Sequence, residues 1–136
     1  MHRFFTEDHH RQLIDNGADG NLGKDHVPVV KLFTPDAQAT WLLTEIDNCC
    51  PGIAYGLCDL GLGFPELGYV SLEELVTVRG PLKLPVERDL QFSATHPISV
   101  YAEAARNARC ITTDSRLLEQ AKEKLIRAGY LKRAQP

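Results

Sequence analysis

The chain has 136 residues, of which 43% are hydrophobic and 24% are charged, and its formal net charge is −3. These values exclude a disordered chain and a fibre, and the length is typical of one compact domain. No apolar stretch approaches the roughly 20 residues that a membrane-spanning helix needs. Near the N-terminus two aromatic residues are followed, after one threonine, by two acids, which argues against a secretory leader. We therefore expect a single domain over 1–136 that works in the cytoplasm.

The charges are unevenly distributed along the chain. Residues 36–89 hold nine acidic and three basic residues, whereas residues 97–136 hold four acidic and eight basic residues. A basic segment of this kind either binds a partner or lies against the acidic part of its own domain. The four cysteines, two of which are adjacent, are expected to be free thiols, because a chain of this size folds without disulfides.

The first predicted element is a short helix over about 7–16. Thr6 is a suitable N-cap, because its hydroxyl oxygen can accept a hydrogen bond from an early backbone N–H of the helix. Glu7 and Asp8 then lie favourably near the positive end of the helix dipole. The following residues, 16–24, are rich in glycine and asparagine and are predicted to form a loop.

An antiparallel meander of strands is predicted for the middle of the chain, 27–92. In the strand over 40–46 the two-residue period gives two mixed faces, so the pattern does not indicate which face is buried. Ser71 lies three residues before Glu74, a spacing typical of a capped helical turn over 71–75. Alternation of residue types and turn signals predict strands over 27–34, 40–46, 53–60, 66–70 and 84–92.

Two helices are predicted after the meander. Pro97 suits the first position of a helix of about three turns. A second apolar stripe ends at Gly129, which is a typical helix stop. The predicted fold class is α+β, an antiparallel sheet of about four to five strands in 27–92, covered on one face by the N-terminal helix and by the two C-terminal helices in 97–136.

Several motifs in the middle of the chain carry a family resemblance. They include Phe33-Thr34-Pro35-Asp36, Thr40-Trp41, Tyr55-Gly56-Leu57, the run from Glu66 to Leu75 and Leu84-Pro85-Val86-Glu87-Arg88-Asp89. In this order, over about 27–92, they resemble the bacterial "domain of unknown function 2958" family of small plasmid and mobile-element proteins. The resemblance implies a compact cytoplasmic protein without a known activity, with the basic helical segment 97–136 as an addition to the family core.

Two pairs of acidic residues are candidates for a catalytic metal site. Within each pair the residues are two positions apart on a predicted strand, so their side chains project from one face about 7 Å apart. If the two strands were neighbours, the acids could bind Mg²⁺ or Mn²⁺ for a hydrolytic reaction. Acids on the solvated face of a sheet are the alternative, and no metal is expected. The candidates are Glu45, Asp47, Glu87 and Asp89, with His96 as a further ligand.

Other chemistry has less support in the sequence. The spacing of Cys49, Cys50 and Cys58 does not fit the usual zinc motifs. No G-x-S-x-G elbow and no phosphate-binding glycine loop is present, so no cofactor is expected. Trp41 and Tyr69 could stack on bases, but core packing explains both better.

The basic C-terminal segment is the candidate surface for a nucleic-acid or protein partner. Its arginines and lysines recur about one helical turn apart and could contact phosphates. We expect a non-enzymatic binding or accessory module of a mobile element; the alternatives are a metal-dependent hydrolase that uses the sheet carboxylates and a structural, oligomer-forming protein. The candidate contacts are Arg106, Arg109, Arg116, Lys122, Lys124 and Arg127.

Overall fold

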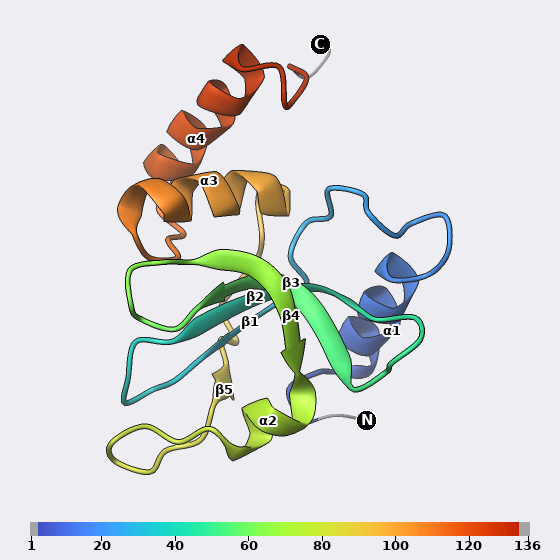
Figure 1. Ribbon diagram of the computed structural model, residues 1–136, viewed down its shortest axis with the longest axis vertical. Coiled ribbons are helices and arrows are strands. Elements are labelled where there is room, and N and C mark those ends of the chain that lie inside the picture. Colours follow the sequence, from blue (N-terminus) through green and yellow to red (C-terminus); the bar gives the residue numbers. More distant parts are fainter. Residues whose placement is uncertain (1–2, 134–136) are drawn as a thin grey trace.

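The fold is that of a computed structural model of the chain, in which residues 3–133 are described. It is an α+β fold with a five-stranded antiparallel sheet in the order β4-β3-β2-β1-β5 (Figure 1). The predicted fold class is therefore confirmed. The strands are β1 (Val30–Phe33), β2 (Thr40–Ile46), β3 (Ile53–Asp59), β4 (Glu66–Ser71) and β5 (Glu87–Arg88), and the helices are α1 (Glu7–Asn16), α2 (Leu72–Thr77), α3 (Ile98–Ala108) and α4 (Ser115–Arg127).

The predicted helix caps are present. The Thr6 hydroxyl oxygen accepts a hydrogen bond from the His9 backbone N–H at 3.1 Å, and the His9 ring nitrogen Nδ1 accepts one from the Thr6 N–H at 3.3 Å. At α2, the Ser71 hydroxyl oxygen accepts a hydrogen bond from the Glu74 N–H. These local hydrogen bonds satisfy backbone donors that have no partner inside the helix, which explains why both helices begin where the sequence predicts.

The central strand β2 is buried on both of its faces. Its register with β3 shifts between Leu43 and Glu45, so that one extra residue lies in β2 at this point. Such a bulge reverses which side chains face each side of the sheet. Trp41, Leu43 and Ile46 consequently belong to one core, although Ile46 is three positions after Leu43. This bulge explains the mixed faces of the sequence pattern.

Two hydrophobic cores lie on opposite faces of the sheet. On the first face, Leu13 of α1 and Leu72 of α2 pack against Trp41 and its neighbours. On the second face, Leu42 and Leu57 pack against residues of α3 and α4. The helices are therefore divided between the two faces, and the expectation that they would cover one face is wrong.

The helix α4 packs on α3 and extends away from the sheet (Figure 1). Leu118 and Ala121 are its buried residues, at 1% and 2% exposure. The segment between α3 and α4 brings Ile111 to the end of β3. No helix in the part of the chain that the structure describes is long and apolar enough to cross a membrane.

The last strand is much shorter than the predicted 84–92. Glu87 and Arg88 pair with β1, and the Asp89 backbone N–H donates a last hydrogen bond to the Lys31 carbonyl oxygen at 2.9 Å. The Asp89 carboxylate accepts a hydrogen bond from the Gln91 backbone N–H at 2.9 Å, which turns the chain away from the sheet. Local hydrogen bonding by an aspartate therefore ends the strand, as is common in turns.

Candidate functional site

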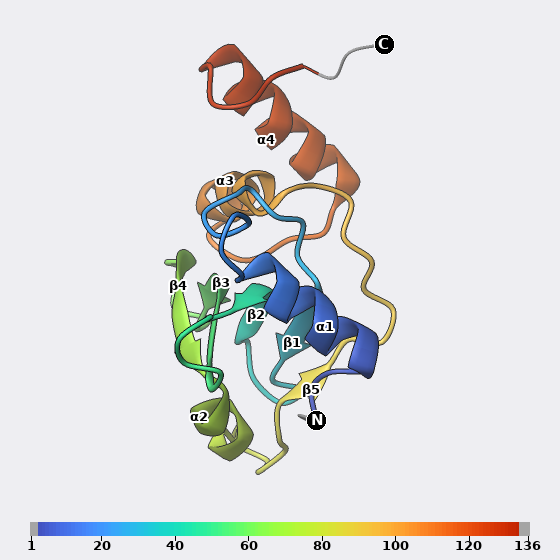
Figure 2. The same cartoon turned by 90° about the vertical axis from the view of Figure 1, so that its right-hand side faces the viewer.

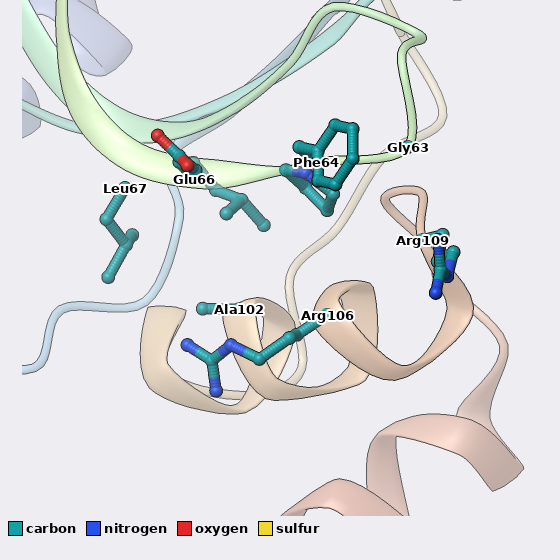
Figure 3. Close-up of a pocket in the computed structure, with 9 residues that line it drawn as sticks. Gly63, Phe64, Glu66, Leu67, Ala102, Arg106 and Arg109 are labelled. Carbon is teal, nitrogen blue, oxygen red and sulfur yellow. The ribbon is translucent and has the colours of Figure 1, made fainter.

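A groove of about 490 Å³ lies between α3 and the hairpin formed by β3 and β4 (Figure 3). We call it the α3–β4 groove. It differs from two further hollows, which lie on the outer surfaces of single helices, α1 and α4. The α3–β4 groove joins two elements far apart in sequence, and its lining includes Leu57, Phe64, Glu66, Leu67, Ala102, Arg106 and Arg109.

The hairpin wall of the groove is apolar and exposed. Gly61 and Gly63 adopt positive φ angles of 80° and 89°, which L-residues rarely adopt, so they fix the turn before Phe64. The Phe64 side chain is 73% exposed and Leu67 is 42% exposed. Leu67 pairs with Leu57 across the sheet and so faces the side that α3 covers. This wall offers apolar surface that the protein itself does not bury.

The helical wall carries two arginines. Ala102 and Arg106 lie four residues apart on one face of α3, and Arg109 is the residue at which the helix ends, in a left-handed conformation with a φ of 63°. The Arg106 guanidinium donates a hydrogen bond to the Glu103 carboxylate at 3.0 Å, and Lys124 of α4 also contacts this carboxylate at 3.3 Å. Arg109 forms no ion pair with any described residue. The groove therefore has an excess of positive charge on its α3 side.

A row of polar side chains crosses the same sheet face beside the groove. Glu45 pairs with Tyr55, which in turn pairs with Tyr69 of the edge strand. The two tyrosine rings meet edge to face, with centroids 5.0 Å apart. Tyr69 is 68% exposed, so the expectation that it packs in the core is wrong, because no element covers β4 there. Trp41 is buried at 3% exposure, as expected.

Burial perturbs two acids of this row. The pKa of the Glu45 carboxyl is raised, mainly because burial disfavours its charged form, while His26 nearby opposes the shift. The pKa of the Tyr55 hydroxyl is also raised, first by burial and then by the neighbouring Tyr69 and Glu45.

A buried carboxylate fixes both walls of the groove. Asp59, at the end of β3, is only 2% exposed. One of its oxygens accepts a hydrogen bond from the Gly61 N–H at 2.9 Å, in the β3–β4 turn. The other oxygen accepts one from the Ile111 N–H at 3.0 Å, in the segment after α3. Both carboxylate oxygens are thus satisfied, which makes this buried charge tolerable.

The two predicted acid pairs lie on strands that are not neighbours. Glu45 is in β2 and Asp47 directly follows it, whereas Glu87 is in β5, and β1 separates the two strands. Asp89 forms an ion pair with Lys31 at 3.3 Å. Among residues 3–133, no group of three or more histidine, cysteine, aspartate or glutamate side chains is arranged to hold a metal ion.

His96 takes part in a separate polar network that connects α3 and α4. Its ring nitrogen Nε2 lies 2.9 Å from the Glu119 carboxylate, and Nδ1 lies 2.7 Å from the Thr95 hydroxyl. The Tyr101 hydroxyl accepts a hydrogen bond from the Thr95 N–H at 3.1 Å. The His96 side chain is therefore occupied by residues of the protein itself. Its hydrogen bond to Glu119 lowers the pKa of that carboxyl.

The predicted basic residues fall into two places. Arg106 and Arg109 line the groove, whereas Arg116, Lys124 and Arg127 surround a hollow on the outer surface of α4. The acids Glu119 and Glu123 lie among these α4 residues, so the charges there alternate in sign. Lys122, the sixth candidate, also lies on α4. The structure thus separates the arginines of the groove from those of α4.

Sequence reasoning missed the hairpin wall and the buried Asp59. A signal for the wall was present, because Leu62 and Phe64 stand between glycines and a proline in a turn, where apolar side chains have no core to enter. No such signal distinguishes Asp59 from the other acids, since its two N–H donors come from residues 61 and 111.

Comparison with known proteins gives one result. No curated protein and no solved structure matches the chain. The family described as "Protein of unknown function (DUF2958)" matches residues 4–112. This match is longer than the region 27–92 that carries the resemblance, and it includes α1 and α3, so only α4 lies outside the family core. The chain therefore belongs to the DUF2958 family of proteins of unknown function.

Proposed function

We propose that this protein is a non-enzymatic binding module, a cytoplasmic accessory protein of a bacterial mobile element, which binds a partner protein in the α3–β4 groove. The observation that carries the proposal is the exposure of Phe64 and Leu67 on one wall of a groove whose other wall presents Arg106 and Arg109, with the exposed Tyr69 on the same strand beside it. Exposed aromatic residues and arginines at the rim of an apolar groove are typical of protein interfaces. The mobile-element setting rests on the family resemblance.

A protein partner fits the groove better than a nucleic acid. Phosphate binding requires available cations, and of the two arginines that line the groove Arg106 is already paired with Glu103, which it shares with Lys124 of α4. The hairpin wall is mostly apolar, and burying a leucine or phenylalanine side chain contributes about 1.5–3 kcal/mol. Apolar contact is therefore the larger source of affinity in this groove.

The hydrolase alternative has less support. A metal-dependent site would need the carboxylates of β2 and β5 to converge, and β1 lies between these strands. Glu45 has a raised pKa, but it lies in a row with two tyrosines and not beside the other candidate acids of β5. The strand order therefore argues against the metal-dependent hydrolysis and favours the binding module.

A library of random peptides tests the proposal. Peptides displayed on phage are selected on the purified protein, and the affinities of the enriched sequences are measured. Because Leu67 lines the groove, we expect Leu67→Asp to weaken binding at least about tenfold, the equivalent of about 1.4 kcal/mol. The control is Leu82→Asp, because Leu82 is equally apolar, is 74% exposed and lies outside the groove.

A parallel titration with labelled DNA and RNA distinguishes the other partner class. Two results together would replace the proposed function with nucleic-acid binding by α4. The protein would bind nucleic acid in a salt-sensitive way that Leu67→Asp leaves unchanged, and no selected peptide would depend on the groove. In that case Arg116→Ser and Arg127→Ser should reduce the binding, because each removes a cation from α4.

A further inference from the structure

The strand β4 has an open edge. It is the last strand in the sheet order, and β3 is the strand hydrogen-bonded to it (Figure 2). In the described chain, no backbone hydrogen bond joins the outer side of Glu66–Ser71 to another segment. The backbone donors and acceptors on that side are therefore available to an added strand.

The edge of β4 also lacks the features that usually prevent strand addition. It has six residues, pairs with β3 without a bulge, and contains neither lysine nor proline. The opposite edge of the sheet is different, because β5 has only two residues and follows Pro85. Of the two edges, β4 is the one that can accept an extended segment.

The side chains of β4 determine what an added strand would contact. Leu67 and Tyr69 point to the face that α3 partly covers, whereas Glu66 points to the other face. Figure 3 shows the Glu66 carboxylate on the side of the strand away from Arg106. An added strand would place every second side chain beside Leu67 and Tyr69, on the arginine side of the sheet.

We infer that the partner segment is extended and acidic, and that it joins the sheet beside β4 with an acid directed toward Arg109. The inference rests on the proposed function and specifies the chemistry of the partner. The charge of the groove favours an acid, because Arg109 has no ion pair among the described residues and the carboxylate of Glu66 faces away from Arg106.

A second copy of the chain fits this edge less well. Residues directly opposite each other in paired strands face the same side of a sheet. The β4 strand of another copy would therefore present Leu67 and Tyr69 to the arginine side and keep Glu66 on the other side. It would bring apolar contact and no carboxylate from the strand itself, so an acidic segment of another protein is the better complement.

An N-methyl scan of the selected peptides tests strand addition. In an added edge strand, the N–H groups of alternate residues point toward β4. We expect N-methylation at every second residue to weaken binding about tenfold and at the intervening residues to have little effect. If N-methylation has little effect at every position of peptides whose binding still depends on Leu67, the inference is overturned and the proposed function still holds.

Charge reversal tests the acidic character of the partner. We expect the peptides selected on the native protein to carry acids at a fixed distance from their apolar residues. On Arg109→Glu the selection should change to basic residues at those positions, and the original peptides should bind about tenfold more weakly. Arg116→Glu is the matched control, because Arg116 lies on α4 outside the groove, and it should leave affinity unchanged. Neutral consensus sequences would overturn the inference.

The oligomeric state shows whether a second copy of the chain, instead of another protein, occupies the edge of β4. Light scattering of the purified protein should give the mass of a monomer. A different result would be a dimer that Leu67→Asp dissociates, when no selected peptide depends on the groove. It would show that a second copy occupies the edge of β4, and it would overturn both the inference and the proposed partner. Peptides that do not depend on the groove at all would overturn the proposed function itself.

Discussion

Glu45 is only 7% exposed as a residue, and its carboxylate accepts a hydrogen bond from the Thr44 hydroxyl at 3.4 Å. Burial of an acid without strong partners disfavours its charged form, which is the main cause of its raised pKa. The sequence pattern could place Glu45 on a strand, but it could not predict burial. The bulge beside Glu45 determines which face of the sheet Glu45 occupies, and the local residue types do not predict that bulge.

Replacing Glu45 with glutamine should stabilise the protein at neutral pH. The native state holds the proton of Glu45 more tightly than the unfolded chain, so the free energy of unfolding falls as the pH rises from 4.5 through the raised pKa. Glu45→Gln removes this loss. We expect the stability difference between Glu45→Gln and the native protein to be larger at about pH 7 than at about pH 4 in urea titrations.

The control for this experiment is Glu87→Gln, because Glu87 is an exposed acid on a strand of the same sheet. Its stability difference from the native protein should change little over the same pH range. If the stability difference between Glu45→Gln and the native protein is the same at both pH values, burial does not destabilise the charged form of the Glu45 carboxyl group in the native protein.

The four cysteines should differ in reactivity. All four are free; Cys49, Cys50 and Cys110 are exposed, whereas burial raises the pKa of the Cys58 thiol to about 11. Only the thiolate reacts, and at pH 8 about one Cys58 in a thousand is ionised. A disulfide reagent should therefore modify three thiols rapidly and the fourth only after unfolding in urea. Rapid modification of all four thiols in the folded protein would contradict this expectation.

Most of the elements could be predicted because their signals are local. The bounds of α1 and β2 agree with the predicted 7–16 and 40–46, since caps and residue alternation are encoded within a few positions. The strand β5 could not be delimited, because the turn at Asp89 competes with strand pairing. The division of the helices between two faces depends on long-range packing and was not predictable.

Gly56 is a residue at which two strands approach each other closely. A Cβ atom added to Gly56 would collide with the Leu42 carbonyl oxygen, which is backbone and cannot rotate away. We expect Gly56→Ala to lower the free energy of unfolding by about 2–4 kcal/mol, measured by urea denaturation. Gly68→Ala is the matched control on β4, where a Cβ atom meets nothing within 4 Å. Equal stability of the two variants would contradict a close contact at Gly56.

The whole molecule combines a double-sided sheet with a helix that extends from it. The strands β2 and β3 contribute to both cores, whereas α4 packs mainly on α3. The basic composition of 97–136 predicted a distinct segment, and the family match over 4–112 separates α4 from α3 within that segment. Composition could not make this separation, because both helices carry arginines.

Hydrogen exchange should reflect this arrangement. Elements with less buried apolar surface open more readily than the central strands of a core. We expect the amides of α4 to exchange faster than those of β2 and β3 when peptides are followed by mass spectrometry. Protection of α4 equal to that of β2 would show instead that α4 unfolds only together with the sheet.

The hydrogen bonds of Asp59 have a consequence for the thermodynamics of association. The same carboxylate holds the turn of the hairpin wall and the segment that follows α3, so the width of the groove is set before any partner arrives. A binding site that is already formed loses little conformational entropy when it is filled. Most of the ordering cost would then fall on the partner segment, and rigidifying that segment should increase affinity more than any change to the groove itself.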